Sequence, residues 1–445
     1  MSEQYSYDIQ RRSIRPRRSL KRVRSSASRR LPLRQWIVFG VIGALLAVAA
    51  MLLAVFVFIP MGLGTALSAG TVSLLPLVIV AGAIWWLNRF QPQTRGALIF
   101  SFAWGAIGSI TLTLIAGFAV EMAIAMTTQE PTSTMFLSAV MQAPIVEEAM
   151  KGLGLLLLML AGRHYVSTPV SGVLHAMLIG SGFAFTENIT YFGRALAAAH
   201  ITGSSTDFWS MLFMRGLLSP FAHAVFTSLT GLALGIAAER RSVIMGVLLG
   251  LGGLGVAMSL HALWNGSAIL VSMKNPDAGI RAFLTYYAAV QVPLFLILTA
   301  VVLGLVWRQQ RVIRRQLSTY AQAGWFSEEE VASFAALRGR RRVRRWAASQ
   351  GAVVLWAVRE MQRIALALAV HRQAMLGGRP TARTRRTERA LLEELVSQRR
   401  LVSALSIHTA PTSRTIPPEA VKLQQAPGSS AAAASTMGGA DGQTA

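Results

Sequence analysis

Long apolar stretches separated by short polar connections fill most of the chain between residues 35 and 307. A helix needs about 20 apolar residues to cross a bilayer, and each of these stretches reaches that length. The pattern predicts an all-α polytopic membrane protein with about eight transmembrane helices. The predicted spans are residues 36–59, 65–87, 97–124, 134–160, 170–192, 208–237, 243–271 and 281–307.

The two ends of the chain differ sharply from this apolar middle. Residues 1–34 contain 11 Lys and Arg and predict a basic cytoplasmic tail without fixed structure, whereas residues 35–307 form the predicted membrane domain. Residues 308–402 contain 20 Arg and 7 Glu and predict an Arg-rich helical region in the cytoplasm. Its predicted helices lie near 327–338, 341–375 and 384–402. Residues 403–445 are rich in Ala, Ser, Pro and Gly and predict a disordered tail.

Positive charge alternates between the connections of the predicted spans. Arg89 and Arg95 follow the second span, Arg163 the fourth and Arg240-Arg241 the sixth, whereas the other connections are poorer in Lys and Arg. Positive loops stay in the cytoplasm, so we expect both termini there, in a multi-pass protein of a bacterial cell membrane. The net charge of +24 then favours anionic lipid headgroups, and not nucleic acid, as partners of the basic termini.

Several kinds of catalytic site have no counterpart in this sequence. The chain contains no cysteine, which excludes disulfides, thiolate metal ligands and a cysteine nucleophile. It has no His-Glu-x-x-His motif, no Gly-x-Gly-Asp motif and no P-loop. Ser181 lies in Ile-Gly-Ser-Gly, which lacks the first glycine of a rhomboid Gly-x-Ser-Gly motif. The sequence therefore argues against zincin, presenilin-type and rhomboid proteases.

The fourth predicted span contains three charged residues in the middle of an apolar stretch. Glu147 and Lys151 are four residues apart and share a helix face, and Glu148 is three residues before Lys151. Each charge at bilayer depth costs about 2.5–3.5 kcal/mol on insertion scales, so three together indicate a function. The competing interpretation is an inert salt-bridged cluster that fixes helix packing.

The next three predicted spans add further polar groups. The fifth contains Glu187 and Asn188, and the sixth contains His223 shortly after a proline that loosens the helix. The seventh contains His261 and Asn265, four residues apart on one face. Each group taken alone has an ordinary structural explanation, such as a packing hydrogen bond. Together with the glutamate pair, they predict one buried site for proton transfer and water activation.

At these residues the chain resembles the PrsW family of intramembrane proteases, over about residues 140–266. The matching pieces are Glu147-Glu148-x-x-Lys151, Gly182-Phe183-Ala184-x-x-Glu187-Asn188-x-x-Tyr191, His223, and His261 with Trp264-Asn265. The resemblance implies an intramembrane endopeptidase that cuts membrane-anchored proteins, such as anti-sigma factors, outside the cytoplasm. It also implies a distant similarity to the CAAX prenyl endopeptidases. The sequence departs from the family at Ser171-Gly172, where members often have an acidic residue before the glycine.

For this site we expect hydrolysis of a peptide bond by an activated water. Glu147 or Glu148 would be the general base, and Lys151 would set the charge of the carboxylates. The oxyanion would be stabilised by His223, or by His261 together with Asn265.

Glu187 would orient a histidine or the water. The family is usually classed among metalloproteases, and Glu and His are suitable zinc ligands. Zinc is therefore a candidate cofactor, although the spacing lacks a dedicated zinc motif and the metal stays open. The candidate ligands are Glu148, Glu187, His223 and His261.

Two other functions would also use polar groups at membrane depth. A proton-coupled transporter needs Glu, Lys and His there, but the sequence has no convincing internal repeat of the kind many transporters show. A non-catalytic scaffold would instead bind partners or lipid through the Arg-rich region. The transporter is the main alternative to the protease.

Overall fold

The computed structural model of the chain describes residues 33–126, 137–240, 242–274, 279–376 and 381–406. Within these ranges every regular element is a helix. The tails predicted for residues 1–34 and 403–445 fall almost entirely outside the described residues, so the prediction that they lack fixed structure stays a prediction.

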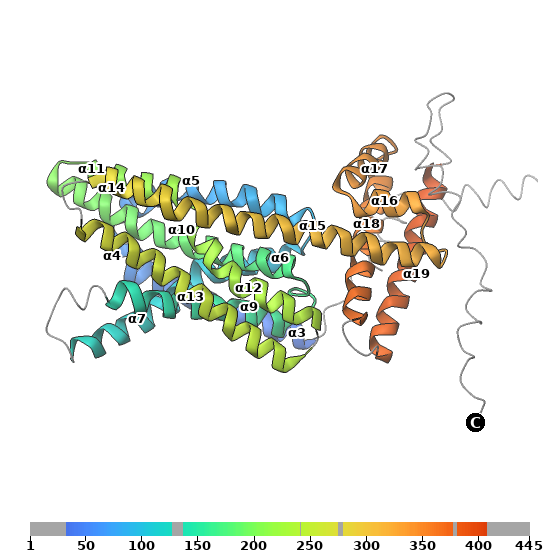
Figure 1. Ribbon diagram of the computed structural model, residues 1–445, viewed down its shortest axis with the longest axis horizontal. Helices are drawn as coiled ribbons and strands as arrows, with labels where there is room; N and C mark the ends of the chain where they lie inside the picture. The colour runs from blue at the N-terminus through green and yellow to red at the C-terminus, as the bar shows by residue number, and fades with distance from the viewer. Residues whose placement is uncertain (1–32, 127–136, 241, 275–278, 377–380, 407–445) are drawn as a thin grey trace, which may run out of the picture. The chain divides into compact units, whose positions relative to one another are not determined.

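The membrane region consists of α-helices interrupted by short π-helical segments, which carry the label η (Figure 1). In chain order the elements are α3 (Leu33–Leu53), η1 (Ala54–Phe58), α4 (Ile59–Met61), α5 (Leu63–Asn88), α6 (Arg95–Ala103), η2 (Trp104–Ser109), α7 (Ile110–Ala125), η3 (Ser138–Gln142), α9 (Ala143–Ala161), α10 (Pro169–Thr202), α11 (Thr206–Met211), η4 (Leu212–Leu218), α12 (Ala222–Arg240), α13 (Val243–Lys274), α14 (Gly279–Tyr286), η5 (Tyr287–Gln291) and α15 (Val292–Gln322). The C-terminal helices are α16 (Glu328–Ala335), α17 (Leu337–Ser349), α18 (Ala352–Leu376) and α19 (Ala382–Ser406).

Seven helical stretches in the described residues are long and apolar enough to cross a membrane. They are Gly40–Met61, Leu63–Asn88, Arg95–Val120, Pro169–Thr202, Thr206–Arg240, Val243–Ser267 and Arg281–Gln322. These stretches confirm that the chain is an all-α polytopic membrane protein. The remaining predicted span, residues 134–160, corresponds to η3 and α9, and its three charged residues distinguish it from the seven apolar stretches.

The chain divides into two units within α3, after Val48. The described part of the first unit is residues 33–48, where the side chains of Val41, Leu45 and Val48 are exposed. An exposed apolar surface of this kind is expected of a helix that faces lipid. All other elements belong to the second unit.

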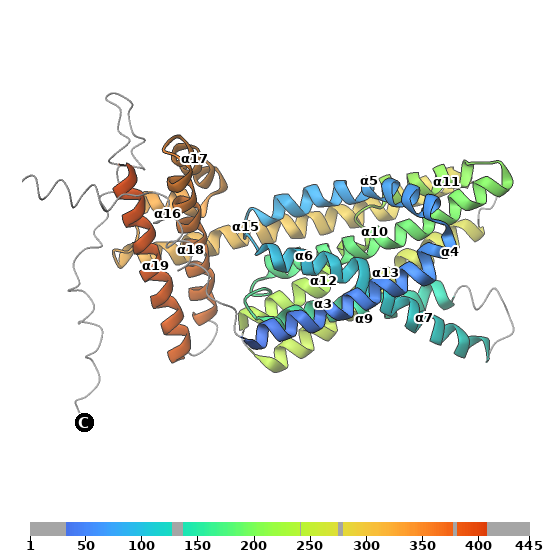
Figure 2. The same ribbon diagram turned by 180° about the vertical axis from the view of Figure 1, so that it is seen from behind.

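In the second unit, α10 packs against α5, α12, η2 and α9 (Figures 1 and 2). Glycines make these contacts close. A Cβ atom on Gly105 of η2 would lie 1.9 Å from the carbonyl oxygen of Ile179, and one on Gly180 would lie 2.4 Å from that of His223. Since small residues let helix backbones approach each other in a membrane, Gly105 brings η2 next to α10 and Gly180 brings α12 next to α10.

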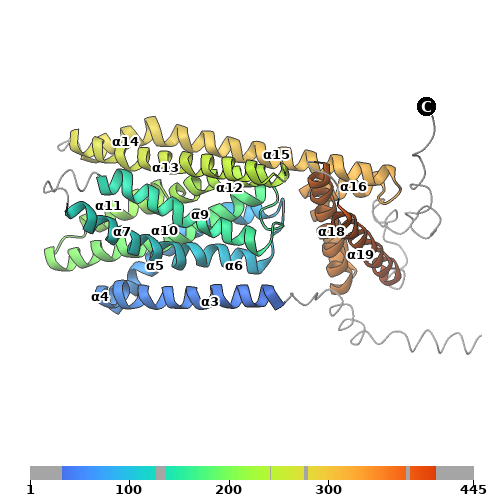
Figure 3. The same ribbon diagram turned by 90° about the horizontal axis from the view of Figure 1, so that it is seen from below.

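The charged helix α9 packs against α7, α10, α12 and α13 (Figure 3). The indole Nε1 of Trp104 donates a hydrogen bond to the carbonyl oxygen of Met150 at 3.0 Å. A Cβ atom on Gly154 would lie 2.2 Å from the Trp104 ring, so this close contact also requires glycine. The packing encloses the charged face of α9 in protein.

A break in the helix precedes α12. The segment η4 ends at Leu218, and Ser219 leaves the helical conformation with φ −124° and ψ 36°. Pro220 lacks a backbone N–H and cannot continue a helical hydrogen-bond ladder. The helix resumes at Ala222, so His223 lies in the first turn of α12.

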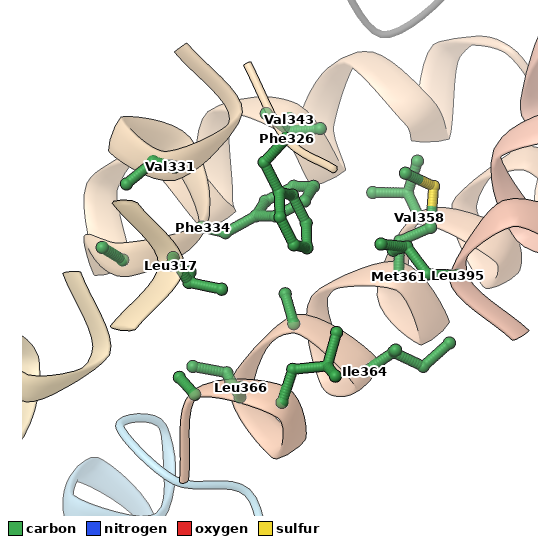
Figure 4. Close-up of a cluster of buried hydrophobic side chains, with 14 of the residues drawn as sticks. Leu317, Phe326, Val331, Phe334, Val343, Val358, Met361, Ile364, Leu366 and Leu395 are labelled. Carbon is green, nitrogen blue, oxygen red and sulfur yellow. The ribbon is translucent and has the colours of Figure 1, made fainter. Parts of the chain in front are cut away.

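The C-terminal helices α16 to α19 pack with the end of α15 around a hydrophobic core of their own (Figure 4). A capping box begins α16: Ser327 accepts from the backbone N–H of Glu330, whose carboxylate accepts from the N–H of Ser327. The prediction of one helix over 341–375 is wrong. Gly351 adopts φ 105°, a conformation that favours glycine, and it separates α17 from α18.

Candidate active site

The first turns of α9 carry the charged residues of the site. Glu147, Glu148 and Lys151 are 7%, 1% and 0% exposed. The Lys151 Nζ lies 3.0 Å from Oε2 of Glu147 and 2.8 Å from Oε1 of Glu148. The helical spacing thus brings both carboxylates to one ammonium, as the sequence predicted. A buried ammonium depends on such partners, because taking it out of water is costly.

His223 connects this group to α10. Its Nδ1 lies 3.0 Å from the Lys151 Nζ and 3.8 Å from Oε2 of Glu147. Its Nε2 lies 2.8 Å from Oε2 of Glu187. Because an ammonium can only donate, the Nδ1 of His223 accepts from Lys151, and Nε2 carries the proton that is donated to Glu187.

His261 reaches the site from α13. Its Nδ1 lies 3.2 Å from Oε1 of Glu148, and Thr227 of α12 donates its hydroxyl to Oε2 of the same carboxylate at 2.9 Å. The ring of Phe226 stacks on the imidazole with centroids 4.8 Å apart. Both oxygens of Glu148 therefore have partners. Oε1 of Glu147 has none among the described residues.

Arg215 of η4 contacts the residues of the site that lie on α10. Its Nη2 donates to Oε2 of Glu187, and its Nε donates to Oδ1 of Asn188 at 3.0 Å. The guanidinium also lies 4.0 Å from the centroid of the Tyr191 ring. Arg215 thus fixes the carboxylate that orients His223.

Arg215 is not among the site residues predicted from the sequence. The sequence did contain a signal for Arg215. A charged arginine within an apolar span has a free-energy cost of insertion comparable to that of Glu147. Its position near the end of a predicted span made an interfacial role equally compatible with the sequence.

The two asparagines of the predicted site have separate environments. Asn188 contacts Arg215 and reaches the other groups only through it. Asn265 donates from Nδ2 to the carbonyl oxygen of Ala139 in η3 at 3.0 Å. The structure therefore brings the predicted acids, lysine and histidines together. The amide of Asn265 instead hydrogen-bonds to the backbone of the neighbouring segment η3.

Four buried side chains supply donor atoms that lie within 4.8 Å of one another: Glu147, Glu148, His223 and His261. Zinc binds carboxylate oxygen and imidazole nitrogen at about 2.0–2.2 Å, so the donor chemistry fits and the group could hold a metal ion. The ammonium of Lys151 hydrogen-bonds to three of these four side chains. A metal ion and this ammonium would compete for the same donors.

Glu187, one of the predicted ligands, lies outside this group of four, and Glu147 is present in its place. Glu187 instead accepts from the far nitrogen of His223. Carboxylates commonly orient metal-binding imidazoles in this way. That Glu187 orients a histidine stays a prediction, and the histidine it contacts is His223.

Carboxylates, an ammonium and imidazoles meet inside a helical membrane bundle, an arrangement that fits an intramembrane hydrolase and also a proton-coupled transporter. Residues 93–314, which include every residue of the site, match the sequence model of the family described as PrsW family intramembrane metalloprotease. The chain belongs to this family, and it is an intramembrane protease. No curated protein and no solved structure matches the chain. Family membership favours the protease over the transporter and the scaffold.

Proposed function

We propose that the protein cleaves a peptide bond in membrane-anchored protein substrates, with a water activated by a glutamate of α9. The observation that carries the proposal is the convergence of α9, α10, α12 and α13 on one buried group of acids and bases. The resemblance of the site residues to the family extends the proposal to substrates such as anti-sigma factors.

Glu147 is the better candidate for the general base. Its Oε1 has no hydrogen-bond partner among the described residues, whereas both oxygens of Glu148 accept hydrogen bonds. Glu147 is also the more accessible of the two side chains, at 9% against 0%. A water beside Oε1 would transfer a proton to Glu147 as its oxygen attacks the scissile carbonyl carbon. The same proton would pass to the departing amine when the C–N bond breaks.

The other groups would prepare this carboxylate and the developing oxyanion. Lys151 would set the charge of the two carboxylates, since its ammonium hydrogen-bonds to both. His261 is the candidate donor to the oxyanion, because both ring nitrogens of His223 are engaged, one with Lys151 and the other with Glu187. Glu187 and Arg215 hold the imidazole of His223 in place.

A bound metal would polarise the scissile carbonyl and make its bound water more acidic. The residues that would hold it are Glu147, Glu148, His223 and His261. The sequence-based expectation that the chain lies in a bacterial cell membrane with both termini in the cytoplasm is part of the same proposal.

Co-expression with single-span candidate substrates tests the proposal. Wild type is compared with Glu147→Gln, Glu148→Gln and His223→Ala. We expect fragments with wild type and a loss of about 10²–10⁴-fold with Glu147→Gln. Glu393→Gln, on the exposed surface of α19, is the matched control and should cleave normally. Equal amounts of fragments from all the variants would rule out catalysis at this site.

A further inference from the structure

The C-terminal helices form a second site of concentrated charge, outside the protease centre. A hollow of about 600 Å³ lies between α17 and α18. Figure 1 shows these two helices beside each other. The lining of the hollow is mostly basic and consists of Arg341, Arg344, Arg345, Ala348, Leu355 and Arg359. We call this feature the arginine hollow.

The arginine hollow has no acidic residue in its lining. Within the described residues, no carboxylate pairs with any of its four arginines, and α17 contains no acidic residue. The nearest acid in the sequence of α18 is Glu360, which accepts from Nε of Arg363 at 2.8 Å. Four arginines from two helices thus line one hollow with no carboxylate paired to them in the described residues.

A buried arginine adjoins the hollow. Arg340 is 2% exposed, and its Nε and Nη2 have no hydrogen-bond partner in the part of the chain that the structure describes. Burial, followed by the charge of Arg344, lowers the pKa of Arg340 to about 10. Burial also lowers the pKa of Arg344, with further contributions from arginine neighbours led by Arg359. These charges repel one another, so an anion in the hollow would relieve the repulsion.

The hollow lies close to the end of a membrane span. Nη1 of Arg340 donates to the carbonyl oxygen of Arg89 at 3.1 Å, and Arg89 is the residue that follows α5. The charge of Arg89 acts on both Arg341 and Arg344. A site beside the last residue of a span is at the depth of lipid headgroups.

Arginine is the side chain best suited to phosphate, because its planar guanidinium donates two parallel hydrogen bonds and stays charged. We propose that the arginine hollow binds the phosphate of an anionic phospholipid headgroup, with Arg344, Arg345 and Arg359 as the principal donors. Ala348 and Leu355 supply an apolar wall for the uncharged part of the headgroup. This inference is independent of the proposed catalytic mechanism.

The test uses the full-length protein in nanodiscs of zwitterionic phosphatidylcholine. Binding of a short-chain phosphatidylglycerol is measured by native mass spectrometry. The double variant Arg345→Gln/Arg359→Gln removes two exposed guanidinium groups from the hollow. Arg385→Gln/Arg386→Gln, on the exposed face of α19, is the control with the same loss of charge.

We expect the hollow variant to weaken binding about thirtyfold and the control to bind as wild type does. Equal weakening of phosphatidylglycerol binding in both variants would mean that the lipid is attracted by the overall positive charge. That result would overturn the proposed site. Displacement of the lipid by inorganic phosphate at the same concentration would overturn the lipid as its ligand. Circular dichroism of both variants checks that the helices are intact, so that a loss of binding is not a loss of fold.

Discussion

At the scale of single residues, the protease centre depends on Lys151. Its ammonium contacts two carboxylates and one imidazole, and it lies 3.9 Å from the centroid of the Phe183 ring. No part of the side chain is exposed. The ammonium of Lys151 lies where the oxygens of Glu147 and Glu148 and the Nδ1 of His223 meet. A cation would need the same position, so Lys151 should determine whether the site can bind one.

Replacing Lys151 by methionine should therefore raise the affinity of the site for zinc. The substitution Lys151→Met removes a like charge and frees the donors of Glu147, Glu148 and His223. We expect zinc to bind about tenfold more tightly or better, as measured by calorimetry on the purified protein. Lys151→Arg, which keeps the charge, is the control. Equal zinc affinities in the two variants would show that the ammonium does not compete with a metal.

Arg215 gives a second prediction at this scale. Arg215→Gln should lower kcat for peptide cleavage about 10- to 100-fold with little change in KM, because Glu187 would no longer hold His223 in position. Arg215→Lys should restore little of the activity, since an ammonium cannot reproduce the paired contacts to Glu187 and Asn188. The measurement is steady-state cleavage of a membrane-anchored substrate.

The matched control for Arg215 is Arg308→Gln, which removes a guanidinium that pairs with Glu239 at 2.7 Å. This pair is distant in sequence from the catalytic motifs and should leave kcat unchanged. A rise in KM alone for Arg215→Gln would instead assign Arg215 to substrate binding.

The sequence could identify the charged members of the site but not all of their contacts. A charge within an apolar span is visible in the sequence because its cost does not depend on the tertiary structure. The direction of a side chain, in contrast, depends on the tertiary structure. Asn265 shares a helix face with His261, yet its amide reaches the backbone of Ala139.

At the scale of elements, the lengths of the apolar stretches were sufficient to place the membrane helices. The local breaks in the backbone could not be predicted from the sequence. The bounds of α5, Leu63–Asn88, closely match the predicted span 65–87. The π-helical segments have no signature in hydrophobicity, because they change the winding of a helix and not its composition. The close contact of α10 with α12 likewise depends on which glycines face each other.

Gly180 provides the test at this scale. Gly180→Ala would place a Cβ 2.4 Å from the carbonyl oxygen of His223, and backbone on both helices must then move apart. We expect a loss of about 1–3 kcal/mol in stability and a clear loss of cleavage, because His223 moves with its backbone. Thermal unfolding and substrate cleavage are measured on the same preparation.

Gly252→Ala in α13 is the control for this change. A Cβ there meets no atom within 4 Å, and alanine favours a helix over glycine by about 0.5–1 kcal/mol. The control should therefore keep its activity. If Gly180→Ala cleaves as well as the control does, close packing of α10 on α12 is not what positions His223.

At the scale of the whole molecule, the distribution of arginine predicts how the chain crosses the membrane. Arg163 follows α9 and Arg240 is the last residue of α12, and the positive-inside rule assigns both helix ends to the cytoplasm. The connection between α10 and α11 should then lie on the opposite side. The arginine hollow, which follows α15 in the chain, should share the side of Arg240 and face the leaflet rich in anionic lipid.

Because the chain has no cysteine, single cysteines can report this topology without background. Ser204 lies between α10 and α11, and Ser242 lies between α12 and α13; both are exposed. A membrane-impermeant maleimide added to intact spheroplasts should label Ser204→Cys and leave Ser242→Cys unlabelled until the cells are permeabilised. Ser349→Cys, at the end of α17, should behave as Ser242→Cys does. The reverse pattern would place the termini outside the cell, and the lipid site would then face the wrong leaflet.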